Sequence, residues 1–334
     1  MKILAIDTSC DESCAAIVDT HSWQLLADEV VSHVGQMQAF GGIVPEVASR
    51  EHLKALPLVV QTALGRAGLT LAQIDHFAVT NRPGLIGALL VGLTYAKSLA
   101  FALGKPFSVH DHLQGHLYSP ALCALEGQTP PPFPWIALVV SGGHTELFFV
   151  ESETRSRWLG GTLDDAAGEA FDKVGKLLGL AYPAGPAMDK WVRSEARAED
   201  RARFKLPRST PDTFSFSFSG LKTAVANQLA KLRTPSAADK LALAASAQEA
   251  ILDPLVDRIQ LAQKTFGVSQ VVVTGGVACN SRLREKLPAA FFPPPRHCSD
   301  NAAMIAHIAA LQARAGALQA APWTATPVAQ AEFA

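Results

Sequence analysis

The sequence lacks an excess of charge of either sign. This absence excludes a protein that binds nucleic acid or a membrane through its overall charge. Its 334 residues carry 29 lysines and arginines against 30 aspartates and glutamates, a formal net charge of −1. Such a balance provides no bulk attraction to nucleic acid or to an anionic membrane surface. Any contact with RNA must therefore come from a local basic patch.

The chain is also poor in paired cysteines and in long apolar runs. Its five cysteines are scattered and include no C-x-x-C pair, which favours reduced thiols over a disulfide framework. Only four consecutive apolar residues (3–6) precede Asp7, too few for a signal-peptide core. The most apolar stretch, residues 85–103, is interrupted by Lys97 and predicts a buried helix rather than a membrane span. We therefore expect a cytoplasmic protein with no membrane partner.

Short apolar segments separated by polar or glycine turns predict an α/β protein. Apolar residues at helical spacing predict a helix over residues 45–67, and a helix-rich stretch is expected from Asp164 to Phe266. The expected strands cover residues 2–7, 15–19, 25–31, 76–80 and 107–110 in the first half, then 135–150 (strand, glycine turn, strand) and 271–276 in the second.

Both halves open on a strand, a polar turn and a strand, so the sequence predicts two duplicated lobes with a cleft between them. A length of 334 residues also suits two lobes better than one core. The segment TPPPFPW (129–135) marks the boundary, with a first lobe over residues 1–128 and a second over 129–334. The second lobe is expected to end in a C-terminal helix and a loosely held tail of about twenty residues.

Three turns have the composition of anion-binding loops. IDTSCDES, VVSGGHTE and VVTGGVACN each follow a short apolar strand and are rich in Gly, Ser, Thr or Asp. Glycine allows a close approach of the backbone to a ligand, and successive N–H groups can form a nest for an anion. One such turn is an ordinary hairpin feature. Three of them, spread over both halves, favour a site for a nucleotide or an acyl phosphate.

Two histidines within HDHLQGH, His112 and His116, have the i, i+4 spacing that places side chains on one helix face. Leu113 stands where a zinc protease of the H-E-x-x-H type has its glutamate. Asp300, in CSDNAAMIA, is the best candidate for a third ligand, although it also fits a helix N-cap. Two imidazoles and one carboxylate with open positions suit iron(II) or zinc.

The stretch KWVRSEARAEDRARFKLPR (190–208) is rich in basic residues. It can form a solvated helix face or a nucleic-acid patch, and spacing alone does not choose between them.

Taken together, these motifs resemble the tRNA threonylcarbamoyladenosine transferases of the bacterial TsaD type, formerly called glycoproteases. The resemblance runs nearly from end to end of the chain. The motifs that carry it are IDTSCDES, GGIVPEVASREH, PGLIGALLVG, DHLQGHLYSP, VSGGHTEL, LDDAAGEAFDKVGKLLGL, FSFSGLKTA, GGVACN and CSDNAAMIA.

The resemblance implies the fold shared by actin, sugar kinases and heat-shock chaperones (the ASKHA fold). It implies transfer of a threonylcarbamoyl group from threonylcarbamoyl-AMP to the exocyclic amine of the adenosine that follows the anticodon, in tRNAs reading codons that begin with A. It further implies a TsaB-type paralogue and a TsaE-type ATPase as partners, and one divalent metal, with Fe²⁺ favoured over Zn²⁺.

The resemblance also assigns residues to roles. The implied metal ligands are His112, His116 and Asp300. Asp11 is a weaker candidate for orienting groups at the catalytic centre. The residues implied to bind the intermediate are Val139, Val140, Ser141, Gly142, Gly143, Asp172, Gly185, Asp189 and Asn280.

The chain departs from the family pattern at four positions. It has Gln114 where the family usually has Glu, Arg82 and Ala184 where Gly is common, and Cys279 in place of a small Ala. Three alternatives stay open at this point: an ASKHA-type ATPase or small-molecule kinase, a metalloprotease, and a non-enzymatic scaffold, against which the intact ligands and turns speak. The histidine pair disfavours a kinase, because such enzymes hold Mg²⁺ on carboxylates, water and phosphates. Leu113 disfavours the protease.

Overall fold

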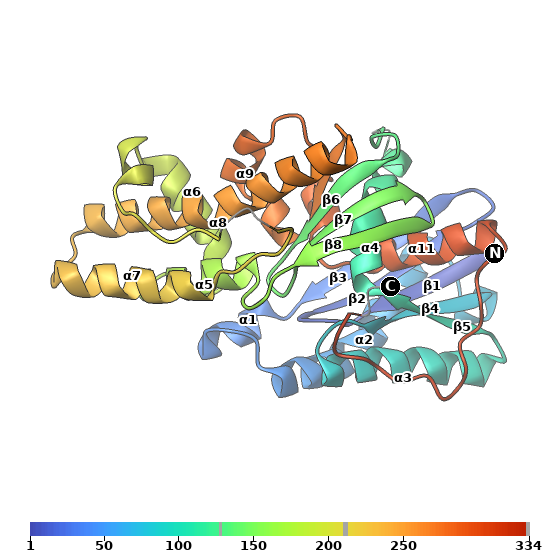
Figure 1. Ribbon diagram of the computed structural model, residues 1–334. Coiled ribbons are helices and arrows are strands. Elements are labelled where there is room, and N and C mark those ends of the chain that lie inside the picture. Colours follow the sequence, from blue (N-terminus) through green and yellow to red (C-terminus); the bar gives the residue numbers. More distant parts are fainter. Residues whose placement is uncertain (127–128, 210–212, 332–334) are drawn as a thin grey trace. The chain divides into compact units, whose positions relative to one another are not determined.

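The structure is a computed structural model that describes residues 1–126, 129–209 and 213–331. It divides into two compact units (Figure 1): unit 1 comprises Met1–Pro130 and Ser299–Phe333, and unit 2 comprises Pro131–Cys298. The expected lobe boundary after residue 128 adjoins residues 127–128, which lie outside the described residues.

Unit 1 is built on a five-stranded sheet with the strand order β3-β2-β1-β4-β5. β1 pairs antiparallel with β2 and parallel with β4, and β4 pairs parallel with β5. The strands predicted for this half are therefore confirmed. Their bounds are β1 Lys2–Asp7, β2 Glu12–Asp19, β3 Gln24–Ser32, β4 His76–Arg82 and β5 Phe107–Asp111.

Helices cover both faces of this sheet, because successive residues of a strand face opposite sides. Leu4 and Ile6 of β1 share a core with α2 (Pro45–Ala67) and α3 (Ile86–Leu103). Ile3 and Ala5 of the same strand pack against α11 (Ala302–Arg314). By length and mean hydropathy (1.7), α3 could also cross a membrane, and 33% of it is buried inside the structure.

The C-terminal helix lies in unit 1, whereas the sequence analysis assigned it to the second lobe. The physical reason is that one face of the first sheet would have no helix over it if α11 packed elsewhere. Small and apolar residues of α11, including Ala302, Ile305 and Ala309, are buried against β1 and β2. Without α11 this apolar face of β1 and β2 would be exposed to water.

The described part of the C-terminal tail is held against unit 1 rather than loose. The Ala321 amide donates to the Phe107 carbonyl at 2.7 Å, and the Val328 amide donates to the Asn81 carbonyl at 2.8 Å. The Trp323 ring packs on Phe107 with centroids 5.0 Å apart. These contacts correct the expectation for residues up to 331; residues 332–334 lie outside the described residues.

Unit 2 repeats the strand order of unit 1 with the order β8-β7-β6-β9. β6 pairs antiparallel with β7 and parallel with β9, as β1 does with β2 and β4. The predicted duplication is thus confirmed in topology. β8 was not predicted, because its sequence RSRWLGG is largely exposed and has little apolar patterning. The bounds are β6 Trp135–Val140, β7 Thr145–Ser152, β8 Arg155–Gly161 and β9 Val271–Thr274.

The stretch predicted to be rich in helix contains the main helices of unit 2, and α5 and α8 enter its core with the sheet. The 30-residue α8 is buried along much of its length. The bounds are α5 Ala167–Leu178, α6 Ala184–Glu195, α7 Ser219–Leu232 and α8 Ala237–Phe266. The short elements are α1 Val34–Met37, η1 Gln38–Phe40, η2 Leu71–Gln73, α4 His112–Tyr118, η3 Ser119–Glu126, η4 Glu199–Ala202, η5 Gly276–Cys279, α9 Ser281–Lys286 and α10 Pro295–Cys298.

Candidate metal centre and glycine turns

The two histidines of HDHLQGH stand on α4, directly after β5. Asp111, the last residue of the strand, is the N-cap of the helix, and its Oδ1 accepts from the amides of Leu113 (2.8 Å) and Gln114 (3.2 Å). This cap starts the helix at His112, so that His116 follows one turn later on the same face. The two imidazole centroids lie 4.7 Å apart at an interplanar angle of 89°.

Asp300 meets both histidines from the start of α11. His116 Nε2 lies 3.1 Å from Asp300 Oδ1, and His112 Nε2 lies 3.5 Å from the same atom. The N-cap of α11 is Asn301, whose side chain accepts from the Met304 amide at 2.9 Å. Because Asn301 caps the helix, the Asp300 carboxylate is left to face the imidazoles.

A glycine allows α4 to lie close against α11. A Cβ built on Gly115 would lie 2.8 Å from Met304 Cγ and 3.1 Å from Ile305 Cδ1, and both of these side chains are buried. The helix that carries the histidines and the helix that follows Asp300 therefore pack with almost no space at this point. Gly115 is the residue that makes this approach possible.

Asp7 orients His112 from behind, a role that the sequence analysis did not assign. Asp7 Oδ2 lies 2.8 Å from His112 Nδ1, and Ser9 Oγ lies 3.0 Å from the same nitrogen. A carboxylate on one ring nitrogen directs the other nitrogen toward a metal and raises its basicity. The only sequence signal for this residue was its place at the carboxyl end of a buried strand, beside a polar turn.

The charges around the three residues fit a cation. Burial opposes ionisation of Asp300, but His112 and His116 outweigh burial and hold the pKa of this carboxyl well below its usual value. Burial, together with the charges of Asp300 and Asp11, raises the pKa of Glu12 well above its usual value. The ligand atoms of His112, His116 and Asp300 lie within 4.8 Å of one another. Two imidazole nitrogens and one carboxylate oxygen, next to further acids, form a set that can hold a divalent metal.

Asp11 is buried in the same turn, near Glu12 and Cys10. Its backbone carbonyl accepts from the His33 amide at 2.8 Å. The structure therefore places Asp11 among the acids around the ligand set rather than within that set.

In unit 2 the turn after β6 presents two exposed glycines. The turn is closed by the Ser141 amide, which donates to the His144 carbonyl at 2.8 Å, and by Ser141 Oγ, which accepts from the His144 amide at 3.1 Å. A Cβ built on Gly142 or Gly143 would meet no atom within 4 Å. Val139 and Val140 are fully buried in β6, so only their backbone can take part in binding.

The turn also touches the next elements of unit 2 closely. A Cβ on Gly168, at the start of α5, would lie 2.5 Å from the Ser141 carbonyl oxygen. Gly275, after β9, has a φ of +91°, and a Cβ there would lie 2.3 Å from the Val140 carbonyl oxygen. The close approach at both points requires glycine. The ends of β6 and β9 and the start of α5 therefore meet at one place.

The four remaining predicted binding residues lie in two groups, each held together by hydrogen bonds. Asp172 Oδ1 accepts from the Ala184 amide at 2.7 Å and the Gly185 amide at 3.3 Å, and so holds the start of α6. Asp189 and Asn280 both accept from Gln248 Nε2 of α8, at 3.1 and 3.3 Å. Gln248 was missed by the sequence analysis, because a single glutamine within a long helix carries no pattern.

Glu146 was also missed, although it belongs to the motif VVSGGHTE. It is buried, and its carboxylate accepts a hydrogen bond from Trp158 Nε1 at 2.7 Å. Burial raises the pKa of Glu146 to about 7. This group therefore titrates close to neutral pH.

Three of the seven basic residues in the stretch 190–208 are paired with acids of one long helix of unit 2. Arg201 lies 3.2 Å from Glu249 and Arg208 lies 2.7 Å from Asp253, while Arg203 forms an ion pair with Asp239. All three carboxylates belong to α8. The pairing favours the reading of a packed, solvated surface over that of a nucleic-acid patch.

Three of the four departures from the family pattern have a local account. Arg82 Nε lies 3.4 Å from Asp111, the cap of α4. Gln114 is exposed on α4, away from the buried histidines. The methyl group of Ala184 has room because its neighbour on α5 is Gly175. A Cβ built on Gly175 would lie 2.2 Å from the Ala184 Cβ.

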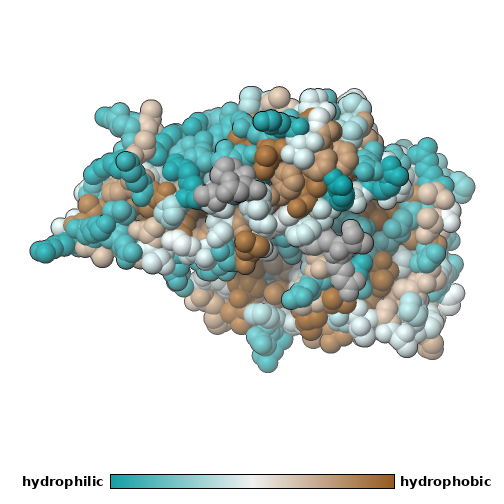
Figure 2. All heavy atoms as spheres, in the orientation of Figure 1, coloured by the Kyte–Doolittle hydropathy of each residue, from teal (hydrophilic) through white to brown (hydrophobic). Residues whose placement is uncertain are grey.

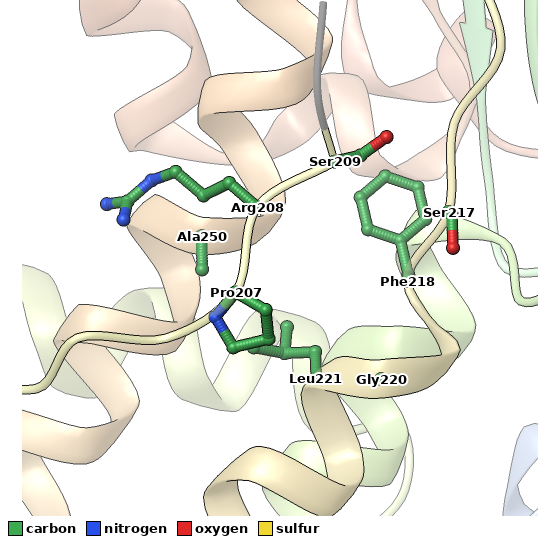
Figure 3. Close-up of a pocket in the computed structure, with 8 residues that line it drawn as sticks. All are labelled: Pro207, Arg208, Ser209, Ser217, Phe218, Gly220, Leu221 and Ala250. Carbon is green, nitrogen blue, oxygen red and sulfur yellow. The ribbon is translucent and has the colours of Figure 1, made fainter.

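One cavity of about 130 Å³ lies elsewhere in unit 2 (Figure 3). Pro207, Phe218, Leu221 and Ala250 form its apolar wall, and none of the predicted site residues lines it. It is therefore no part of the candidate site.

Comparison with known proteins places the chain in one family. A family model described as TsaD, tRNA N6-adenosine threonylcarbamoyltransferase, matches residues 24–307. A protein of that name from Symbiobacterium thermophilum is 48% identical over 313 residues, which cover 91% of this chain and 89% of the relative. Another from Sorangium cellulosum is 45% identical over 348 residues, 98% of this chain and 96% of the relative.

Among solved structures, full-length HypF in its phosphate- and nucleotide-bound form is similar with a TM-score of 0.61 and 13% identity. The match covers 95% of this chain and 56% of that chain. At this identity the likeness concerns the fold alone. It confirms the predicted ASKHA-type fold class.

Proposed function

The chain belongs to the family of tRNA N6-adenosine threonylcarbamoyltransferases, and from that premise we propose that it uses threonylcarbamoyl-AMP as donor and a bound metal ion in the transfer. The acceptor is the exocyclic amine of the adenosine that follows the anticodon, in tRNAs reading codons that begin with A. The single observation that carries the metal-dependent part is the convergence of two imidazoles and one carboxylate on one point.

His112, His116 and Asp300 would hold the metal through His112 Nε2, His116 Nε2 and a carboxylate oxygen of Asp300. When bound, a divalent metal supplies Lewis acidity that polarises a carbonyl or phosphoryl oxygen. Asp7 keeps His112 Nδ1 engaged, so that Nε2 is the nitrogen presented as ligand. The ligand set suits Fe²⁺ or Zn²⁺, and we favour Fe²⁺.

In unit 2 the exposed backbone of Gly142 and Gly143 would donate N–H groups to the oxygens of the donor. Among the described residues, no atom lies within 4 Å of a Cβ built on either glycine. Asp189 and Asn280, held by Gln248, would fix the adenosine part. Because the donor is a mixed anhydride that is already activated, no covalent enzyme nucleophile is required. Asp11 is assigned only an orienting role.

A protein partner is supported by apolar side chains exposed on α2 and α3 of unit 1. Leu53 is 63% exposed, Leu58 64% and Leu90 50%. Figure 2 shows hydrophobic side chains gathered over this part of the molecule. Such a patch is typical of an interaction surface. We propose that a TsaB-type paralogue binds there and that a TsaE-type ATPase completes the system.

We further propose that the protein works in the cytoplasm. All five cysteines are free. Free thiols are maintained in a reducing compartment.

The test is mass spectrometry of nucleosides from an A-decoding tRNA incubated with threonylcarbamoyl-AMP, the partner proteins and either wild type or His116→Ala. Metal content of both proteins is measured in parallel. We expect modified adenosine and bound metal with wild type only. His21→Ala, which changes an exposed histidine of unit 1, serves as control and should match wild type.

Each contrary result has a distinct meaning. Full modification by His116→Ala with its metal lost would remove the metal from the reaction. No product with wild type, in the presence of partners shown to be competent, would overturn the proposed donor and reaction.

A further inference from the structure

Two cysteines of unit 2 meet beside the loop that carries Asn280. Cys279 is the last residue of η5 and is exposed, whereas Cys298 is the last residue of α10 and is fully buried. η5 and α10 pack against each other, and Cys279 and Cys298 are the last residues of these two elements. Cys298 Sγ also lies 3.3 Å from the Pro293 carbonyl oxygen.

An arginine adds positive charge next to the exposed thiol. Arg284 Nε donates to the Ala278 carbonyl at 2.9 Å, which places the guanidinium beside Cys279. Its Cζ lies 4.7 Å from the Phe292 ring centroid. Within the described part of the chain no carboxylate forms an ion pair with Arg284. Its charge is therefore available to stabilise a thiolate.

These contacts distinguish Cys279 from the other cysteines. A hydrogen bond from Cys298, and after it the charge of Arg284, outweigh burial and lower the pKa of the Cys279 thiol to about 7. Burial raises the pKa of Cys10 and Cys14 well above the usual value. Of the five thiols, all within the described residues, Cys279 combines exposure with a cationic neighbour. These are the two properties of an oxidation-sensitive cysteine.

We propose that Cys279 is a site of oxidation by hydrogen peroxide and that Cys298 converts the product into a Cys279–Cys298 disulfide. In the first step the thiolate sulfur attacks one peroxide oxygen and the O–O bond breaks. Cys279 becomes a sulfenic acid, and the other oxygen leaves as water after taking up a proton. In the second step the Cys298 sulfur attacks the sulfenic sulfur, the S–OH bond breaks and a second water leaves. Two thiols are oxidised and one peroxide is reduced, so the sequence is balanced.

The cross-link has a consequence for the neighbouring loop. Asn280 directly follows Cys279 and is the N-cap of α9, where its Oδ1 accepts from the Leu283 amide at 3.0 Å. To form a bond, the two sulfurs must approach to covalent distance, so η5 or α10 must shift. If Asn280 binds the donor, as the proposed function has it, oxidation slows the transfer, and reduction by a thiol restores it.

The first experiment does not depend on the proposed function. The full-length wild type, Cys279→Ala and Cys298→Ser are exposed to hydrogen peroxide, free thiols are alkylated, and peptides are mapped by mass spectrometry. We expect a 279–298 cross-link in wild type that dithiothreitol reverses. Cys298→Ser should instead accumulate a sulfenic acid at Cys279 that dimedone traps, and Cys279→Ala should show neither product. Unmodified Cys279 in the oxidised wild type, or a cross-link between other cysteines, would overturn the proposal.

A second readout separates the cross-link from its effect on transfer. Oxidised wild type should lose transferase activity and regain it with dithiothreitol, while oxidised Cys279→Ala should keep its activity. Full activity of a completely cross-linked protein would overturn the regulatory part. A reduced protein that shows no activity would count against the proposed function, and the peptide map would still decide whether the disulfide forms.

Discussion

Asp7 determines which nitrogen of His112 faces Asp300. A neutral imidazole carries one N–H, and the Asp7 carboxylate at 2.8 Å from Nδ1 fixes that proton there. Nε2 is then left with a lone pair toward Asp300 and His116. Although burial disfavours the charged form, Asp300 and Asp7 raise the pKa of His112 well above its usual value. Bound metal must therefore compete with a proton at this residue.

Replacing Asp7 by Asn should weaken metal binding by about 10- to 100-fold, the usual range for loss of a carboxylate behind a ligating histidine. The amide keeps the size of the side chain but loses the charge that holds Nδ1–H. The measurement is a titration with Fe²⁺ under anaerobic conditions or with Zn²⁺.

The control is Asp19→Asn, at the opposite end of the β1–β2 hairpin, where Asp19 pairs with Lys2. It should leave the affinity unchanged. Equal metal affinity of Asp7→Asn and wild type would show that Asp7 has no influence on the ligand set.

At the residue scale, the sequence could predict contacts between residues that are close together in the chain. The i, i+4 spacing of His112 and His116 follows from helix geometry and could be predicted. The contact between Asp7 and His112 spans 105 positions along the chain and depends on how β1 lies relative to β5. No local pattern encodes it. Whether Asp300 is a metal ligand or a helix N-cap was open for the same reason, and in the structure Asn301 is the N-cap.

At the scale of elements, the position of α4 against α11 controls how far the histidines lie from Asp300. Gly115 is buried where α4 packs against α11, next to Met304 and Ile305. Both neighbours are at most 1% exposed and have little room to move. An added methyl group must therefore push the two helices apart or distort the side chains between them.

Gly115→Ala should lower the free energy of unfolding by about 1–3 kcal/mol, the typical cost of overpacking. It should also weaken metal binding, because the displacement separates His116 from Asp300. Urea unfolding and a metal titration measure the two effects. Without the steric contact, a Gly→Ala change within a helix would have been stabilising.

Gly65→Ala is the matched control, since Gly65 is an exposed glycine of α2 with no atom near a built Cβ. It should raise stability by roughly 0.5–1 kcal/mol through helix propensity alone. A stabilising effect of the same size at Gly115 would contradict close packing of α4 and α11.

At the scale of the whole molecule, the duplicated architecture could be predicted, but the assignment of its last helix could not. The strand–turn–strand patterns at residues 2–19 and 135–150 are local and strongly apolar, and they became equivalent sheets. α11 follows unit 2 directly in the chain, and nothing in its sequence says which sheet face is still uncovered. α11 packs on β1 and β2 because their apolar face would otherwise be exposed to water. The tail follows α11 and was misassigned with it.

Besides the metal ligands, unit 1 buries five histidines, and in three of them the pKa is lowered to about 4 or about 3. The Ser108 hydroxyl lies 2.8 Å from His76 Nε2 and 2.7 Å from His110 Nε2. His307, on α11, packs edge-on against the Trp23 ring. Burial lowers the pKa of His76 to about 4 and that of His307 to about 4. Burial, with the charge of His76, lowers the pKa of His110 to about 3.

These shifts predict that unit 1 loses stability in mild acid. The folded state keeps the three imidazoles neutral, whereas the unfolded chain takes up protons below pH 6.5. The stabilisation is complete above pH 6.5 and is lost as the pH falls toward 4. At pH 5 each histidine costs about 2 kcal/mol, or about 6 kcal/mol together, against a total domain stability of roughly 5–15 kcal/mol.

The measurement is urea unfolding at pH 7 and pH 5 in a background where Trp135, Trp158 and Trp191 are replaced by Phe, so that Trp23 and Trp323 report on unit 1 alone. His110→Gln, which can still bond to Ser108, should reduce the loss between the two pH values by about 2 kcal/mol. His21→Gln, at an exposed position, should leave the loss as in wild type. If His110→Gln and wild type lose the same free energy between pH 7 and pH 5, proton uptake by this histidine is not what destabilises unit 1.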